Sequence, residues 1–313
     1  MFWLIQLIQV FGGNTTREGD YPFAVLLGQA VLKRSNNYVG GTRAPARRVP
    51  QWVCGGTLIN YWYVVTAAHC TAKLAYVRLG EWKVGGFGSD ETSSEGLPPV
   101  QEFRIRPRNV IVHERYKIKF GQIENDIALI RLPRKPNLNI GVQFACLPLP
   151  EAAQQVGLRN WDSELEGKRA TVIGWGYSCY EENSRSFCKF DDIGNKEQQY
   201  LEVEFVSSPY LFTSDPSYLQ VPIVGNEACK DHYTLTEKQV CAGGAVGEGS
   251  CRGDSGGGLF IRNKIMGARS EHEIPWYLLG IVSYGQPACG LGVPEVYTKV
   301  PKYVGWIKNK ISK

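Results

Sequence analysis

The chain has 313 residues, of which 43% are hydrophobic, and it contains 35 glycines and 17 prolines. This length and composition fit a turn-rich globular protein with one large domain or two moderate ones. The formal net charge of +5 is too small to indicate a nucleic-acid-binding protein, so a mildly basic surface is the simpler interpretation.

The first nine residues do not fit a secretion signal. Met1–Ile8 is apolar, but it has no charged start and no small-residue cleavage site. A helix of this length would span ~14 Å, well short of the ~30 Å hydrocarbon core of a bilayer. We therefore expect no membrane anchor, and we interpret residues 1–9 as non-native sequence or a residual pro-segment.

Short apolar or alternating segments rich in Val, Ile, Tyr and Trp follow, separated by Gly, Pro, Asn and Asp. This pattern is typical of strands in antiparallel barrels or sandwiches. The expected strands are Phe23–Leu27, Thr57–Val65, Tyr76–Leu79, Ile127–Leu132, Ala170–Trp175, Leu201–Val206, Leu278–Ser283 and Glu295–Val300. Tyr303–Ile311 has apolar residues at helical spacing, which predicts a C-terminal helix.

Two polar segments interrupt this pattern. Lys33–Pro50 has little apolar content and carries five basic residues, which are Lys33, Arg34, Arg43, Arg47 and Arg48. A solvated loop is the favoured interpretation, and an exosite for an acidic partner is the alternative. Gly85–Pro99 is rich in Gly, Ser and Glu and predicts a surface loop. We expect no metal site, and the alternative is a calcium site that uses the carboxylates of Glu81 and Asp90.

Three motifs carry candidate catalytic groups. Ser255 lies in Gly253–Gly257, where glycines let backbone N–H groups approach a reacting carbonyl that the serine can attack. His69 precedes Cys70, which can pair with Cys54, and the short loop so closed would hold the imidazole. Asp126 begins an apolar strand and needs a partner. His69 is a natural one, because a carboxylate fixes the tautomer that leaves the other ring nitrogen as a base.

With these motifs the chain resembles the trypsin-like (chymotrypsin-fold) serine proteases, over residues 10–311. The resemblance implies that Ser255 is the nucleophile, that His69 is the general base and acid, and that Asp126 orients His69. It also implies an oxyanion hole formed by the N–H groups of Gly253 and Ser255, and support of the carboxylate by Ser283.

The implied fold is all-β, with two six-stranded antiparallel β-barrels, a C-terminal helix, and the active site between the barrels. We expect the first barrel over residues 10–143, carrying His69 and Asp126. The second barrel and the helix are expected over residues 144–313, carrying Ser255 and the substrate pocket. Together the two barrels would form one peptidase domain.

The nine cysteines are spread out rather than grouped in metal-binding pairs, which favours disulfides formed in an oxidising compartment over a zinc site. The family pattern implies the pairs Cys54–Cys70, Cys229–Cys241 and Cys251–Cys289. Cys179 and Cys188 flank a short polar loop and are expected to pair with each other. Cys146 is left unpaired. In relatives with an N-terminal regulatory segment the matching cysteine tethers that segment, so we expect a partner in a missing N-terminal region. A buried free thiol is the alternative.

The resemblance implies an activation switch. Val10–Gly13 matches the mature N-terminus of the family, whose freed amine pairs with the aspartate before the serine, here Asp254. Cleavage in the family usually follows Arg or Lys, whereas Gln9 precedes Val10 here. Either residues 1–9 are not native, or an unusual protease cuts at this bond.

The pocket departs from the trypsin pattern. Gly249 stands where trypsin-like enzymes have an aspartate, and Glu295 stands where glycine is usual. With Ser250, Tyr284 and Gly285, these residues are expected to form the pocket, and Tyr284 and Gly285 to pair with an extended substrate backbone. The shifted carboxylate would give a basic or mixed preference. The alternatives are a preference for small or apolar side chains and an impaired pocket.

These features predict a secreted, extracellular endopeptidase that cleaves protein substrates through an acyl-enzyme, without a cofactor, nucleic acid or membrane partner. A macromolecular inhibitor is a further candidate partner. Val77–Trp82, Cys251–Asp254 and the unpaired Cys146 look most like the protease domain of arthropod clip-domain serine proteases, which act in extracellular immune and melanisation cascades. The alternative is a non-catalytic or weakly active homologue that acts as a cascade cofactor.

Overall fold

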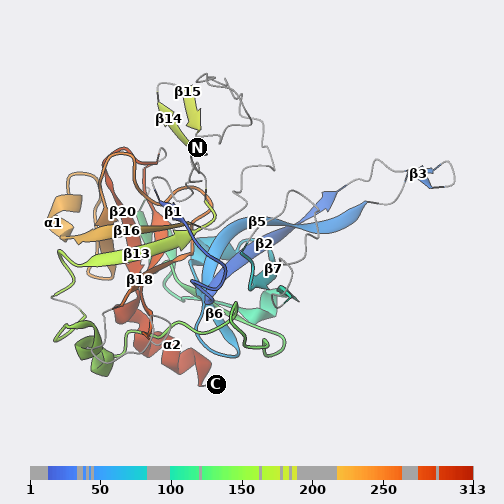
Figure 1. Cartoon of the computed structure of the whole chain (residues 1–313), viewed down its shortest axis with the longest axis horizontal. Coiled ribbons are helices and arrows are strands. Elements are labelled where there is room, and N and C mark those ends of the chain that lie inside the picture. Colours follow the sequence, from blue (N-terminus) through green and yellow to red (C-terminus); the bar gives the residue numbers. More distant parts are fainter. Residues whose placement is uncertain are drawn as a thin grey trace, which may run out of the picture.

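Figure 1 shows the computed structural model of the chain. The structure describes residues 13–33, 38–39, 42–43, 46–82, 99–119, 122–161, 164–176, 179–182, 185–188, 217–262, 274–286 and 289–312. The expected strand Leu201–Val206, the loop carboxylate of Asp90 and the expected mature N-terminus at Val10 lie outside these ranges. Within these ranges, we find no helix whose length and apolar content would let it cross a bilayer.

The N-terminal half forms a curled antiparallel sheet with the strand order β8-β7-β2-β5-β6-β12-β9. Its strands are β2 (Ala24–Lys33), β5 (Arg47–Leu58), β6 (Tyr63–Thr66), β7 (Leu74–Leu79), β8 (Gln101–Arg104), β9 (Val110–Val112) and β12 (Ala128–Arg131). Strand β8 alternates strictly between buried and exposed residues, because one face of the sheet covers the core. The sheet has seven strands rather than the expected six, and its end strands β8 and β9 do not pair within the described residues.

The C-terminal half closes into an antiparallel barrel, because β16 pairs with both β13 and β17. Its six strands are β13 (Arg169–Gly174), β16 (Ser217–Val224), β17 (Gln239–Gly243), β18 (Gly258–Ile261), β19 (Tyr277–Tyr284) and β20 (Pro294–Lys299). Strand β1 (Asn14–Thr15) comes from the other end of the chain and pairs with the first two residues of β16, so it joins the same sheet.

The remaining elements are short. Three hairpins are formed by β3 (Tyr38–Val39) with β4 (Thr42–Arg43), β10 (Lys117–Lys119) with β11 (Gln122–Glu124), and β14 (Cys179–Glu182) with β15 (Arg185–Cys188). The described helices are η1 (Ala68–Thr71), η2 (Pro107–Asn109), η3 (Pro150–Val156), α1 (Asn226–Cys229), η5 (Val300–Tyr303) and α2 (Val304–Ile311). The all-β class and the C-terminal helix, α2, are confirmed.

Two local expectations differ from the structure. Thr57–Val65 is not one strand, because the side-chain oxygen of Asn60 accepts the N–H groups of Trp62 and Tyr63 and turns the chain between β5 and β6. The segment from Lys33 to Pro50 is not wholly a loop, since β2 and β5 extend into it from both sides. The Glu81 carboxylate, named in the calcium alternative, accepts a hydrogen bond from Arg78 at 2.8 Å, and that alternative stays untested because Asp90 lies outside the described residues.

One apolar cluster joins the two halves. It contains buried residues from the first sheet, such as Val25 and Leu129, together with Ile173, Phe260 and Leu278 from the second barrel. The rings of Phe23 and Phe260 lie 4.5 Å apart across this junction. Because protein interiors are close-packed, the shared core fixes the two halves against each other and thereby fixes groups that lie where they meet.

Candidate active site

The turn that carries His69 is held by a disulfide and by a hydrogen bond within the turn. It forms the short helix η1, and the Cys54–Cys70 disulfide ties it to β5. The Thr71 hydroxyl donates a hydrogen bond of 2.7 Å to the Ala68 carbonyl and tightens the turn further. The His69 side chain keeps 24% of its surface exposed, so a restrained backbone presents an imidazole that a substrate can reach.

Asp126 lies just before β12 and is almost completely buried, with 1% of its side chain exposed. Its carboxylate accepts three hydrogen bonds, from the His69 ring at Nδ1 (2.7 Å), from the His69 backbone N–H (3.0 Å) and from the Ser283 hydroxyl (2.6 Å). These donors compensate for the lost solvation of the buried group. With Nδ1 donating to Asp126, Nε2 of His69 is left with its lone pair and can act as a base.

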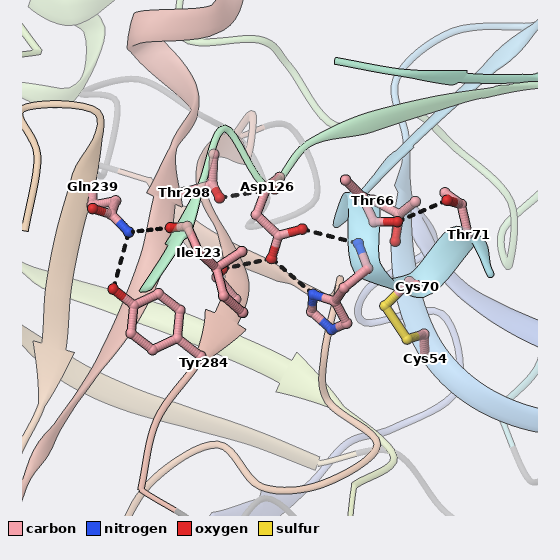
Figure 2. A network of polar contacts seen from close by, with 12 residues as sticks. Cys54, Thr66, Cys70, Thr71, Ile123, Asp126, Gln239, Tyr284 and Thr298 are labelled. Carbon is pink, nitrogen blue, oxygen red and sulfur yellow. Dashed lines mark hydrogen bonds and ion pairs between the residues drawn. A yellow bond between two sulfur atoms is a disulfide. The ribbon is translucent and has the colours of Figure 1, made fainter. Parts of the chain in front are cut away.

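A second layer of polar contacts holds this region and was not anticipated from the sequence. The Thr298 hydroxyl on β20 donates to the backbone carbonyl of Asp126 at 2.9 Å. The Gln239 amide on β17 donates to the Ile123 carbonyl at 3.0 Å and to the Tyr284 hydroxyl at 3.1 Å. Figure 2 shows Asp126 between the Cys54–Cys70 disulfide on one side and the contacts of Thr298 and Gln239 on the other. Thr298 and Gln239 lie in strands and belong to no sequence motif, so the sequence gave no reason to assign them to the site.

The turn that carries Ser255 packs directly on the segments around His69. The Gly55 N–H on β5 donates to the Ser255 carbonyl at 2.8 Å. At Gly256, where φ is +76°, an added Cβ would lie 2.3 Å from the Thr66 side-chain oxygen and 3.0 Å from the Cys70 sulfur. Only glycine fits this space, so the sequence places Ser255 against the strand and the disulfide that hold His69.

The backbone before Ser255 supplies open donors. Gly253 has φ of +99°, a left-handed conformation that favours glycine. Within the described residues, neither the N–H of Gly253 nor that of Ser255 donates to another protein group. Two such donors on one tight turn suit stabilisation of an oxyanion.

The Asp254 side chain is fully buried, between the segment that follows β13 and the turn before Ser255. Its two oxygens accept the N–H groups of Gly176 (2.7 Å) and Cys251 (2.8 Å). A Cβ at Gly174 would lie 1.9 Å from one of these oxygens, so that glycine is required for the fit. Burial raises the pKa of Asp254 to about 7. No ion pair to Asp254 is formed by the residues that the structure describes.

A pocket of about 220 Å³ opens beside Ser255. Four of the five expected pocket residues line it, namely Ser250, Tyr284, Gly285 and Glu295. The fifth, Gly249, does not line it. An added Cβ at Gly249 would lie 2.1 Å from Oε1 of Glu295, so the absence of a side chain there makes room for the carboxyl group.

Glu295 is the buried acidic residue of this pocket, which the cationic Arg252 also lines. Only 7% of Glu295 is exposed, and the Tyr297 hydroxyl donates to its Oε2 at 3.2 Å. Burial, and secondarily the negative charge of Asp254, raise the pKa of Glu295 to about 8, against hydrogen bonds from Ser250 and Tyr297 that lower it. The raised pKa favours the protonated form of Glu295 near neutral pH, and a bound cation would favour the carboxylate.

The cysteines fall into three groups. The disulfides Cys54–Cys70, Cys229–Cys241 and Cys251–Cys289 are present. Cys179 and Cys188 lie opposite each other in the β14–β15 hairpin, while their side chains lie outside the described part of the chain. Cys146 is a free, half-buried thiol whose pKa is raised by burial. The Cys146 N–H donates to the Trp276 carbonyl at 2.8 Å, and the Cys146 carbonyl accepts the N–H of Leu278 at 2.9 Å. The Cys146 backbone therefore pairs with the chain on either side of Tyr277, at the start of β19.

Comparison with known proteins finds one matching family model and several similar proteins. The model of the Trypsin family matches residues 11–189 and 207–307 of the chain. CLIP domain-containing serine protease HP8 of Bombyx mori is 33% identical over 317 residues, covering 97% of this chain and 69% of that protein. Phenoloxidase-activating factor 3 of Holotrichia diomphalia is 33% identical over 319 residues, covering 97% and 72%. Melanization protease 1 of Drosophila melanogaster is 32% identical over 319 residues, covering 97% and 66%.

Proposed function

Because the chain belongs to the trypsin family of serine proteases, we propose that it is a secreted endopeptidase that cleaves protein substrates by acyl transfer. The observation that carries the proposal is the Asp126 carboxylate, which is buried and aligned on Nδ1 of His69 at 2.7 Å. A buried carboxylate held in this way keeps the histidine in the tautomer that general-base catalysis requires. The turn with Ser255 packs on the same segments.

In the proposed reaction, Ser255 Oγ attacks the carbonyl carbon of the scissile bond while Nε2 of His69 removes its proton. The negative charge that develops on the carbonyl oxygen is stabilised by the N–H groups of Gly253 and Ser255. Asp126 stabilises the imidazolium, which then protonates the leaving amine. Water, activated by His69 in the same way, hydrolyses the acyl-enzyme and restores the serine.

We assign the pocket a basic or mixed preference. An Arg or Lys side chain entering beside Glu295 would form an ion pair in a largely dry site, which is favourable because both groups are then compensated. A neutral side chain would meet the protonated carboxyl, which carries no charge to repel it. The pocket therefore accepts both kinds of residue, with the balance set by the protonation of Glu295.

We propose that residues 10–143 and 144–313 act as the two halves of one peptidase domain, switched on by a new N-terminus at Val10. A cationic amine is the complement that a fully buried Asp254 lacks within the described residues. The relatives' names, which include Phenoloxidase-activating factor 3 and Melanization protease 1, favour a role in an extracellular melanisation cascade. Cys146 is then the point at which an N-terminal regulatory chain would be tethered, and a macromolecular inhibitor is an expected partner.

The proposal is tested by labelling with a serine-directed fluorophosphonate, after the chain has been cut between Gln9 and Val10. We expect the label on the wild-type protein and none on Ser255→Ala, together with hydrolysis of Arg, Lys and Phe esters by the wild type alone. An unlabelled Ser255 in a correctly cut and folded protein would contradict catalysis. It would favour a non-catalytic homologue that acts as a cascade cofactor.

A further inference from the structure

The distribution of charge along the first barrel is uneven. Residues 21–80 contain seven Lys and Arg residues and no Asp or Glu, whereas the whole chain has 35 basic and 30 acidic residues. Five of the seven lie in the sequence Lys33–Arg48, whose two ends belong to β2 and β5. A charge of one sign that is concentrated on a projecting element creates a local field that attracts ligands of opposite charge.

This hairpin projects beyond the sheet. Strand β2 loses its β7 neighbour after Gln29, but it continues to pair with β5 as far as Lys33 opposite Arg47. We call Ala30–Lys33 with Arg47–Pro50 the basic arm. Figure 1 shows β2 and β5 extending together from the body of the molecule toward β3. On its other edge β5 pairs with β6 only at its last two residues, so both edges of the basic arm are unpaired within the described residues.

Four described residues of the basic arm, Ala30, Leu32, Arg47 and Arg48, are open to solvent. Arg47 and Arg48 are exposed, and none of the ion pairs within the described residues involves them. As neighbours on one strand they project to opposite faces of the ribbon. Leu32, directly opposite Arg48, is 70% exposed. Arginines beside exposed apolar carbon form a surface that suits a polypeptide, because it offers both charge and apolar contact.

The basic arm leads straight to the candidate active site. Strand β5 runs from Arg47 to Cys54 and Gly55, and the Gly55 N–H bonds the Ser255 carbonyl. The side-chain pocket lies on the other side of Ser255, in the second barrel. A substrate whose side chain fills that pocket therefore continues, beyond the scissile bond, over the first barrel and along β5. At ~3.4 Å per residue, Arg48 lies about 20 Å along the strand from Cys54.

We propose that the basic arm binds an extended acidic segment of the protein substrate, located about six to nine residues C-terminal to the scissile bond. Because β5 runs toward Ser255, the outgoing substrate chain is antiparallel to it and can add to its unpaired edge. Acidic side chains then meet Arg47 and Arg48. The position of the segment rests on the proposed function, whereas the binding of an acidic segment by the basic arm does not.

The first test measures binding without catalysis. Fluorescein-labelled peptides are titrated into Ser255→Ala protein, and fluorescence anisotropy gives the Kd of each. The peptides carry a tail of four glutamates or four glutamines, placed about six to nine residues C-terminal to the scissile bond. We expect the Glu-tailed peptide to bind at least tenfold more tightly, with a preference that weakens as salt is raised from 50 to 300 mM. Arg47→Glu/Arg48→Glu should abolish the preference, and Arg47→Gln/Arg48→Gln should reduce it.

A matched control separates the basic arm from net charge. Lys168→Glu/Lys308→Glu reverses two exposed lysines of the second barrel and α2, and it changes the net charge by the same amount. It should retain the preference for the Glu tail. Equal Kd values for the two tails, or an equal loss in both double variants, would overturn the proposal. So would arm-dependent binding of a sulfated polysaccharide by a protein that shows no preference for the Glu tail.

The second test measures cleavage by the cut wild-type protein. The Glu-tailed substrate should have a KM at least tenfold lower than the Gln-tailed one, at equal kcat, and the arm variant should lose this difference. Cleavage of both peptides with equal KM would refute the basic arm and leave the proposed function intact. Arm-dependent binding of the Glu tail by a protein that cleaves neither peptide would keep the basic arm and refute the proposed function.

Discussion

The region around Asp126 and the pocket around Glu295 each bury one carboxyl group, but they treat it differently. Asp126 accepts three hydrogen bonds, two of them from His69, and its backbone carbonyl is held by Thr298. Glu295 accepts a longer one from Tyr297 and the contacts of Ser250, and burial raises its pKa to about 8. Burial alone therefore does not fix the role of a carboxyl group. The number and kind of donors around it decide whether it serves as a fixed charge or as one that responds to a ligand.

The largest effect is expected where the fixed charge is removed. Asp126→Asn keeps the shape of the side chain but makes it a neutral amide that favours the wrong His69 tautomer. The kcat should fall by about 10⁴-fold at neutral pH, with little change in KM. Steady-state hydrolysis of an Arg ester measures this. Asp231→Asn, an exposed site, is the control and should have wild-type activity. A loss below tenfold for Asp126→Asn would refute the assigned role.

The pocket carboxyl should control how stability changes with pH. Because the folded-state pKa of Glu295 lies above its ordinary value of 4.5, the folded protein holds a proton that the unfolded chain has already released. The stabilisation of the folded state by this proton is fully present below about pH 4. It is lost as the pH rises through about 8, which lowers the free energy of unfolding by on the order of 5 kcal/mol. Urea unfolding with intact disulfides should show Glu295→Gln gaining stability relative to wild type between pH 5 and pH 9.

The control for this measurement is Glu151→Gln, the same change at an exposed position outside the pocket, measured over the same pH range. Asp254 is also raised in pKa, and its charge acts on Glu295, so the difference between wild type and Glu295→Gln includes this coupling as well as the ionisation of Glu295 itself. A constant difference between Glu295→Gln and wild type across this range would show that Glu295 ionises normally.

The sequence predicted those parts of the fold and site that depend on local composition. Alternating β-branched segments gave the β class, and the residues around His69, Asp126 and Ser255 marked the candidate catalytic groups. The turn at Asn60 was missed because Thr57–Val65 is apolar on both sides of it, and a two-residue side-chain cap interrupts no periodicity. The supporting Thr298 was missed for another reason: it reaches Asp126 only through the pairing of distant strands.

The pocket shows a similar limit. The sequence placed Gly249 and Glu295 in it, but it gave only their types and left three outcomes open. A Cβ at Gly249 would clash with Oε1 of Glu295. The two residues are therefore complementary, since the absence of a side chain at Gly249 makes room for the carboxyl group of Glu295. That relation depends on how the turn before Ser255 meets β20, which no local pattern encodes.

Selectivity among substrates gives a smaller but sharper comparison. For the wild type, the ratio of kcat/KM for an Arg ester to that for a Phe ester should rise with pH up to about 8, because ionised Glu295 attracts only the cation. Effects on His69 cancel in this ratio. In Glu295→Gln the ratio should be independent of pH and roughly 10- to 100-fold lower at pH 8, as expected for loss of a charged contact. A wild-type ratio that is flat with pH would refute the assignment.

The smallest predicted effect concerns a positioning residue in the region around Asp126. Ser283→Ala removes one of three hydrogen bonds to the Asp126 carboxylate and leaves both bonds from His69 in place. We expect kcat to fall by about tenfold, or ~1.4 kcal/mol, with KM unchanged, since Ser283 acts through Asp126 rather than on the substrate. Ser283→Thr keeps the hydroxyl and should recover most of the loss. If Ser283→Ala instead changes the ratio of the KM values for Arg and Phe esters and leaves kcat unchanged, Ser283 acts in the neighbouring pocket, which it also lines.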